Sequence, residues 1–212
     1  MEQSCRLPFR SIANIDLTLS TEHFQHQIAQ LITYSSVVGC RHILGDQAFE
    51  LLSSTQVQQN FSTLNQQQLN FEVQLPLANE QAVSALCNII DKNPNICFII
   101  NHAGMPPTTV NDYSALSTWY LGLSKVASFK NVAIKCSGWE MFDGNYSVAW
   151  LQAIIEQCLA VFGDKRVMIS SNFPLTLFSC SYQEYWEMIV KTMVTDQQSL
   201  LHDNSHFWYN FT

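Results

Sequence analysis

The sequence predicts an α/β fold built on a parallel sheet, and two observations lead to this prediction. Apolar runs typical of buried strands alternate with segments of helical period at six places along the chain. Several of these runs end on polar residues followed by a turn, as in Asn101-His102-Ala103-Gly104. Ligands of α/β folds bind outside the carboxyl ends of such strands. We therefore expect functional residues along one rim of the sheet.

The six strand-like runs begin near Ser11, Val37, Leu69, Cys97, Val132 and Val167. Helices are expected over 22–34, 79–92, 112–129, 147–162, 182–193 and 196–202, with two short pieces between 47 and 68 and a last turn at 205–209. On pattern alone, six units favour an open doubly wound sheet, because a TIM barrel needs eight strands. No glycine-rich phosphate-binding motif occurs in the sequence.

Composition favours a single cytoplasmic domain over residues 1–212. The chain has a hydrophobic fraction of 47%, enough for one substantial core. Its net charge is -7 with ten Lys and Arg and no basic run, so we expect no nucleic-acid partner. The sequence has no signal-peptide core and no apolar run long enough to span a membrane. Seven scattered cysteines without a C-x-x-C pair favour reduced thiols.

His102 is the leading candidate for a catalytic residue, because it comes at the end of a run of four apolar residues, after Asn101, and precedes a turn. In that position it would polarise a carbonyl or bind a metal ion through a neutral nitrogen. The alternative is a buried histidine that is bonded to the backbone. Asn101, directly before it, is interpreted as a turn or helix-cap residue.

Arg41 and His42 end the second strand-like run, and only one of them can point into the site because neighbouring strand residues face opposite ways. Arg41 would hold a substrate carboxylate, whereas His42 would join His102. The sequence leaves this choice open. Asp16 ends the first run, and it would either bind substrate or cap the following helix.

Three further candidates follow the last two runs. Ser137 lies in Ser137-Gly138-Trp139, which is not a nucleophile-elbow motif, so a hydrogen bond to substrate or backbone is expected. Trp139 would either wall the pocket or belong to the core. Asn172, before Phe173-Pro174, would orient a water or a substrate carbonyl, or form a turn.

Five segments together resemble the amidohydrolase-related (amidohydrolase 2) family, near the lactonases that act on 2-pyrone-4,6-dicarboxylate and sugar lactones. They are Gly39-Cys40-Arg41-His42-Ile43-Leu44, Asn101-His102-Ala103-Gly104-Met105-Pro106, Lys135-Cys136-Ser137-Gly138, Ser171-Asn172-Phe173-Pro174 and His202-Asp203-Asn204. They occur in the family's order over about residue 12 to the end. The resemblance implies a TIM-type (β/α)8 barrel of the metal-dependent hydrolase superfamily, here incomplete, with about six β/α units that correspond to strands three to eight.

The resemblance also implies hydrolysis of a cyclic ester or a related small carbonyl substrate, with a divalent metal such as zinc as the cofactor. His102 and Asn172 match the family's catalytic positions, and His102 would be the metal ligand if there is one. Lactonases carry an Asp where Asn172 stands, and the family's His-x-His pair does not occur in this sequence. We therefore expect weak or absent metal binding and little lactonase activity, from an N-terminally truncated barrel. The alternative is an inactive remnant or a binding protein of the same fold, and its open sheet edges would favour a homo-oligomer.

Overall fold

The computed structural model describes residues 9–108, 112–192 and 197–211. Six strands form one sheet in the order β1-β2-β3-β4-β5-β6, and every neighbouring pair is parallel. The strands are β1 Ser11–Asn14, β2 Val37–Ile43, β3 Asn70–Gln74, β4 Phe98–Ile100, β5 Val132–Cys136 and β6 Val167–Ile169. This order confirms the prediction of six parallel strands in sequence order, as in a TIM-type α/β fold that has six of the eight units.

Within the described residues, eight α-helices connect and flank the strands: α1 Thr21–Leu31, α2 Ala48–Ser53, α3 Thr55–Gln67, α4 Glu80–Lys92, α5 Tyr113–Ala127, α6 Val148–Phe162, α7 Tyr182–Thr192 and α8 Asn204–Trp208. Short 3-10 turns follow several strands, and a π-helical segment, η6 (Ser199–Asp203), leads directly into α8. Asn79, Asp112 and Ser147 cap their helices with side-chain oxygens. The first helix is capped by Ser20, because its hydroxyl accepts from the His23 amide.

The two faces of the sheet have different cores. Side chains such as Phe71, Phe98 and Ile134 point outward and pack under the helices in the main core. The intervening side chains point to the concave face, where Ile99, Ala133 and Met168 form a smaller cluster with Trp208. Because strand residues alternate in direction, this division also predicts which polar residues share the concave face.

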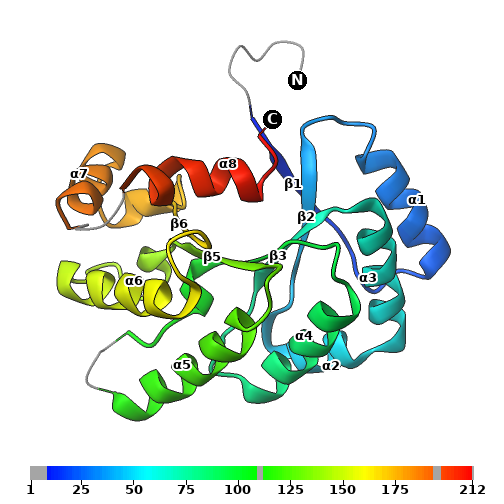
Figure 1. Cartoon of the computed structure of the whole chain (residues 1–212), viewed down its shortest axis with the longest axis horizontal. Helices are drawn as coiled ribbons and strands as arrows, with labels where there is room; N and C mark the ends of the chain where they lie inside the picture. Colours follow the sequence, from blue (N-terminus) through cyan, green and yellow to red (C-terminus); the bar gives the residue numbers. More distant parts are fainter. Residues whose placement is uncertain (1–8, 109–111, 193–196, 212) are drawn as a thin grey trace.

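The C-terminal helix lies apart from the other helices. Figure 1 shows α1, α3, α4, α5, α6 and α7 along an arc around the sheet, whereas α8 lies between β6 and β1. Asn70 Nδ2 donates to the Trp208 carbonyl oxygen, and Trp208 Nε1 donates to the Lys165 carbonyl oxygen. These bonds attach α8 to the concave face. The end of the chain then reaches β1, where the Arg10 guanidinium lies 5.0 Å from the Phe211 ring centroid.

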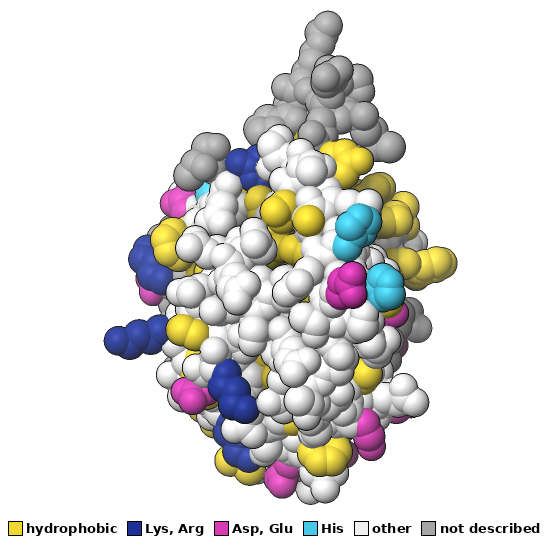
Figure 2. All heavy atoms as spheres, turned by 90° about the vertical axis from the view of Figure 1, so that its right-hand side faces the viewer, with side chains coloured by type: hydrophobic (Ala, Val, Ile, Leu, Met, Phe, Trp, Pro, Cys, Tyr) yellow, Lys and Arg dark blue, Asp and Glu magenta, His cyan; other side chains and the backbone are white. Residues whose placement is uncertain are grey.

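The surface and the thiols agree with the composition. On the face shown in Figure 2, Lys and Arg side chains are scattered and form no continuous stripe. No helix within the described ranges is long and apolar enough to cross a membrane. The six cysteines that the structure describes are all unpaired: Cys40, Cys87, Cys97, Cys136, Cys158 and Cys180.

Candidate active site on the concave face

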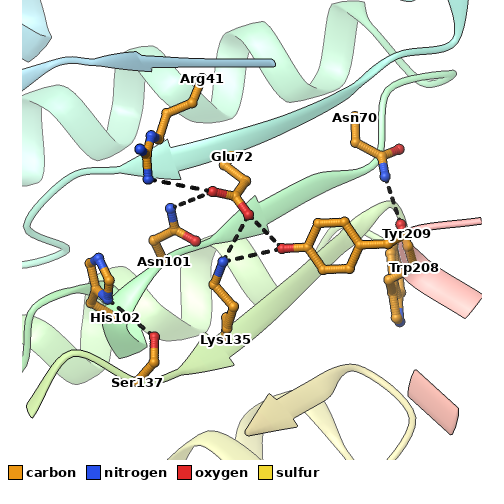
Figure 3. A network of polar contacts seen from close by, with 9 residues as sticks. All are labelled: Arg41, Asn70, Glu72, Asn101, His102, Lys135, Ser137, Trp208 and Tyr209. Atoms are coloured by element: carbon orange, nitrogen blue, oxygen red, sulfur yellow. Dashed lines mark hydrogen bonds and ion pairs between the residues drawn. The ribbon is translucent and has the colours of Figure 1, made fainter. Parts of the chain in front are cut away.

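Strand register brings four polar side chains together on the concave face. Arg41 of β2 pairs with Glu72 of β3, and Ile100 of β4 pairs with Ile134 of β5. Asn101, one residue past Ile100, therefore lies beside Lys135, one residue past Ile134. Figure 3 shows all four side chains meeting near the carboxyl ends of the strands.

Glu72 is the centre of this network. Its Oε1 lies 2.8 Å from Lys135 Nζ and accepts from the Tyr209 hydroxyl at 2.6 Å. Its Oε2 accepts from Asn101 Nδ2 at 2.9 Å and lies 3.7 Å from Arg41 Nη1. Burial alone would raise the pKa of Glu72, but the Lys135 charge and the donated hydrogen bonds lower it to about 2. The carboxylate therefore stays ionised and anchors the donors around it.

His102 lies at the edge of this network, and it is buried and neutral. Its Nδ1 is joined to Ser137 Oγ by a hydrogen bond of 3.1 Å, as Figure 3 shows. Burial, together with the positive charges of Lys135 and Arg41, lowers the pKa of His102 to about 4, against the opposing effect of Glu72. A Cβ on Gly138 would lie 2.3 Å from His102 Nδ1, so only a glycine allows the ring to pack this closely.

The turn that carries His102 has an unusual backbone. Residues 102–105 all have positive φ, with values of 54° at His102, 51° at Ala103, 67° at Gly104 and 56° at Met105. For residues other than glycine this conformation costs roughly 1–2 kcal/mol each. Trp119 Nε1 holds the Ala103 carbonyl oxygen at 2.9 Å, and such strain is typical of functional sites.

The structure answers the question that the sequence left open at Arg41 and His42. Arg41 points to the concave face and reaches Glu72. His42 points the other way, where its Nδ1 lies 3.0 Å from the Ile15 carbonyl oxygen. Asp16 accepts hydrogen bonds from the amide and hydroxyl of Thr18, which lower the pKa of its carboxyl. Of these three candidates, only Arg41 joins the network.

Asn172 and Trp139 lie beyond the ends of β6 and β5. Asn172 Nδ2 donates to Glu140 Oε1 at 2.5 Å, and Asn172 has a φ of 55°, which asparagine tolerates better than most residues. The Trp139 indole is fully buried against Trp150, with ring centroids 5.6 Å apart. That environment favours the core role of Trp139 over the pocket-wall role.

Two cavities lie along the concave side. One of about 440 Å³ is lined by Glu72, Lys135 and Tyr209, together with Ser170 and Ser171 at the end of β6. A larger cavity of about 690 Å³ lies at the amino ends of the strands, where Cys97, Asn131 and Lys165 line it. We assign the site to the smaller cavity, because Glu72 and Lys135 of the charged network line it together with residues that follow β6, at the carboxyl ends of the strands. Arg41, Asn101, His102 and Ser137 are not among its lining residues.

The described residues do not fit a zinc site of the expected kind. A catalytic zinc ion needs about three protein ligands. No group of three or more His, Cys, Asp or Glu side chains in the described ranges is arranged to hold a metal ion. The Glu72 oxygens are already taken by Lys135, Tyr209 and Asn101. Weak or absent zinc binding remains a prediction, and equilibrium dialysis against zinc would test it.

Sequence reasoning missed Glu72, Lys135 and Tyr209 as parts of the site, and it interpreted Asn101 as a turn residue. One signal was available for Glu72: both faces of a parallel sheet are covered, so a charged residue in mid-strand needs a partner of opposite charge. No local signal pointed to Tyr209, because it comes from the opposite end of the chain and contacts Glu72 across 137 positions.

The comparisons with known proteins agree with this geometry. The family model described as Amidohydrolase matches residues 8–211, so the chain belongs to the amidohydrolase family. A zinc-bound amidohydrolase from Burkholderia multivorans superposes with a TM-score of 0.81 at 20% identity, over 95% of this chain and 73% of that one. This likeness confirms the TIM-type fold that the resemblance implied.

Two curated relatives match at 28% identity. An uncharacterised protein of Sinorhizobium fredii matches over 164 residues, 76% of this chain and 53% of its own length. L-fucono-1,5-lactonase of Burkholderia multivorans matches over 129 residues, 57% of this chain and 41% of its own length. The chain therefore spans about half, or less, of the length of these relatives.

Proposed function

We propose that the concave face is the site of a lactonase-like hydrolase, which opens a cyclic ester that carries a carboxylate. The observation that supports this most is the neutral His102, held by Ser137 next to the Arg41–Glu72–Lys135 network at the strand carboxyl ends. Membership of the amidohydrolase family and the similarity to a lactonase support the same reaction class.

The charges of the site favour an anionic substrate. Arg41 and Lys135 contribute two positive charges and Glu72 contributes one negative charge, so the network carries a net charge of +1 in a chain whose net charge is -7. Arg10 also lines the cavity, and Glu72 is the only acidic side chain among its described lining residues. Arg41, with its side chain 42% exposed, is the cation that can turn toward a substrate carboxylate.

His102 is suited to polarise the ester carbonyl. With a pKa of about 4 it is neutral at pH 7, and Ser137 occupies its Nδ1. We assign the Ser137 hydroxyl as the donor to Nδ1, so that Nε2 carries the ring proton and donates to the carbonyl oxygen, where negative charge develops as water attacks the carbonyl carbon. The ring C–O bond breaks next, the leaving alkoxide takes up one proton of the water, and the other proton passes to the solvent as the new carboxyl group ionises. The products are a hydroxyl group and a second carboxylate.

We expect this reaction to be slow. Asn172 cannot serve as the base that the family's Asp provides, and the loss of a general base typically costs about 10²–10⁴-fold. The alternative function is carboxylate binding without turnover. The Arg41–Glu72–Lys135 network beside His102 supports this alternative as well. The two proposals differ only in the rate of ring opening.

Hydrolysis of a panel of carboxylate-bearing lactones at pH 7–8 tests the proposal. We expect slow turnover by the wild type that falls to background in His102→Ala. Saturable binding without turnover in both proteins would favour the binding alternative. The proposal would be wrong if no lactone acid bound and none was opened.

A further inference from the structure

The larger cavity, of about 690 Å³, lies at the ends of the strands opposite to the charged network, and the proposed reaction does not use it. Its wall includes residues that directly precede three strands: Cys97 before β4, Asn131 before β5 and, together with its neighbour, Lys165 before β6. The C-terminal helix α8 adds Phe207 and Trp208. Small-molecule sites typically have volumes of about 300–1,000 Å³, so this cavity is large enough for a ligand.

The amide and guanidinium groups of the wall hold the wall itself together. Asn131 Nδ2 donates to the Ile96 carbonyl oxygen at 2.9 Å, and Asn204 Nδ2 donates to the Val167 carbonyl oxygen at 2.7 Å. Arg166 Nη1 donates to three backbone carbonyl oxygens near the start of β5. These bonds fix the shape of the cavity without a ligand.

Two lysine ammonium groups at the cavity are not held in this way. Lys130 Nζ makes no hydrogen bond or ion pair with any residue that the structure describes. Lys165 Nζ lies 3.5 Å from Ser199 Oγ, at the limit of hydrogen-bonding distance. Asp203, the only acidic side chain among the described lining residues, is already hydrogen-bonded to a neighbouring histidine. With Arg166, the lining therefore carries three positive charges and one negative charge, a net charge of +2 in a chain of -7.

The rest of the wall is aromatic and apolar. The Phe207 and Trp208 rings meet edge to face with centroids 5.6 Å apart, and Phe207 is 73% exposed. Burial raises the pKa of the Cys97 thiol, so at neutral pH this group is an apolar part of the wall and not a thiolate nucleophile. A ligand that matches the cavity therefore has an aromatic body and a negative charge.

We propose that this cavity is a second binding site, which takes an aromatic carboxylate. The ligand's rings lie against Phe207 and Trp208, and its carboxylate pairs with the exposed ammonium groups of Lys130 and Lys165. Lysine binds an anion as a point charge, so one carboxylate can be shared by two lysines without a fixed geometry. The proposal does not depend on the function proposed for the concave face, because it concerns a different cavity.

The role of charge is tested with 2-naphthoate and its uncharged amide, 2-naphthamide. Their dissociation constants are measured at pH 7 by ligand-observed NMR. An exposed charge pair is worth up to about fivefold in affinity, so we expect the acid to bind about 3- to 25-fold more tightly. Lys130→Met combined with Lys165→Met should remove most of this preference.

Two matched controls should keep the preference. Lys125→Met changes a lysine in the last turn of α5 that does not line the cavity. Arg41→Met changes the cation of the concave-face network. A preference that is lost in Arg41→Met but kept in the double lysine variant would place naphthoate on the concave face and overturn the proposal.

Cys97 reports where the ligand binds, because it lines the cavity. The folded wild type is labelled with N-ethylmaleimide, and the labelled peptides are quantified by mass spectrometry. We expect 2-naphthoate to slow the labelling of Cys97 in proportion to the bound fraction. Cys87, which is partly exposed on α4 and does not line the cavity, should be labelled at an unchanged rate.

The labelling measurement needs no variant, so it decides the question even if the double lysine variant does not fold. Failure of 2-naphthoate to bind, equal affinity for the acid and the amide, or labelling of Cys97 that is unchanged at saturation would each overturn the proposal. None of these results would contradict the proposed function, which is tested with lactone acids.

Discussion

Glu72 and His102 are two buried ionisable residues of the concave face whose pKa values are shifted strongly from their ordinary values. The Lys135 charge and hydrogen bonds from Lys135, Tyr209 and Asn101 keep Glu72 ionised, and the same Lys135 charge helps to keep His102 neutral. Their roles are therefore coupled through one cation. Sequence reasoning found His102 from its place at a strand end, but Glu72 had the pattern of an ordinary alternating strand.

The first prediction concerns the pH dependence of stability. His102 binds its proton near pH 6.5 in the unfolded chain but only near pH 4 in the folded one. The unfolded state thus takes up more protons between these values, so stability should fall as the pH drops from 6.5 toward 4, by ~3 kcal/mol. Glu72 adds only about 0.4 kcal/mol to this change at pH 4.5, because it stays ionised in the folded state while its carboxyl is half protonated in the unfolded chain at that pH.

Urea unfolding at pH 7.5 and pH 4.5 measures this change in the free energy of unfolding. We expect His102→Asn to be less sensitive to pH than the wild type by about the same amount. Identical changes in the two proteins would show that the folded chain does not hold His102 in its neutral form.

The second prediction concerns Asn172 and Glu140. Asn172→Asp restores the family's carboxylate, but it places that group against Glu140 Oε1, where Asn172 now donates. Two carboxylates at this distance share a proton, so Asp alone would be a poor base near pH 7. We expect Asn172→Asp with Glu140→Gln to open a lactone acid faster than either single variant, measured as kcat/KM. A larger gain in Asn172→Asp alone would contradict this coupling.

At the scale of elements, strand alternation accounts for most of the site and the C-terminal helix for the remainder. The choice between Arg41 and His42 depends on which residues of β2 face inward, and the sequence of β2 by itself does not contain that information. Pairing with β3 determines it, because Arg41 lies beside Glu72. The short helix α8 was expected as a last turn, but its contact with the concave face was not predictable, because it depends on packing between distant segments.

The third prediction tests the role of α8. Tyr209→Phe removes a donor to ionised Glu72 and an acceptor for Lys135 Nζ while it preserves the ring. Hydrogen bonds to charged groups contribute about 1.5–3 kcal/mol, so the free energy of unfolding should fall by that amount. Hydrogen exchange should also become faster in α8. The matched control is Tyr113→Phe, at an exposed position in α5, which should change neither quantity.

An unchanged stability in Tyr209→Phe would mean that the hydroxyl does not anchor the C-terminal segment. In that case Trp208, packed on Ile99, Ala133 and Met168, would be enough to hold α8 in place.

At the scale of the whole molecule, the sheet is open at β1 and β6 within the described residues. The six strands, their order and most helix positions could be predicted from the sequence, because the apolar periodicity is strong. Pattern alone favoured an open doubly wound sheet, and this was wrong, because the strands follow one another in sequence order from β1 to β6 whereas a doubly wound sheet reverses its strand order. The TIM-type arrangement was predicted from the family resemblance, since six units are compatible with either arrangement.

The fourth prediction is that the chain forms a homo-oligomer through its open edges. The amides of Ser11 and Ile15 donate to carbonyl oxygens of the β2 side, so the amides of Ile12 and Asn14 face outward. Asn14→Pro removes one outward donor without breaking the pairing with β2. Light scattering over a range of concentrations should show an oligomeric wild type and a smaller average mass for Asn14→Pro. A strictly monomeric wild type would show that the edge is not used.

The central claim is that Arg41 and Lys135 make the concave face a binding site for a carboxylate-bearing lactone. Its most direct test compares the affinity of 5-oxotetrahydrofuran-2-carboxylate with that of its uncharged carboxamide. We expect the acid to bind at least about tenfold more tightly, and Arg41→Met to remove most of that difference, because hydrogen bonds to charged groups are worth about 1.5–3 kcal/mol. Lys130→Met, which removes a cation at the opposite ends of the strands, should leave the difference unchanged. Equal affinity for the acid and the amide, or a difference that survives in Arg41→Met, would contradict the claim.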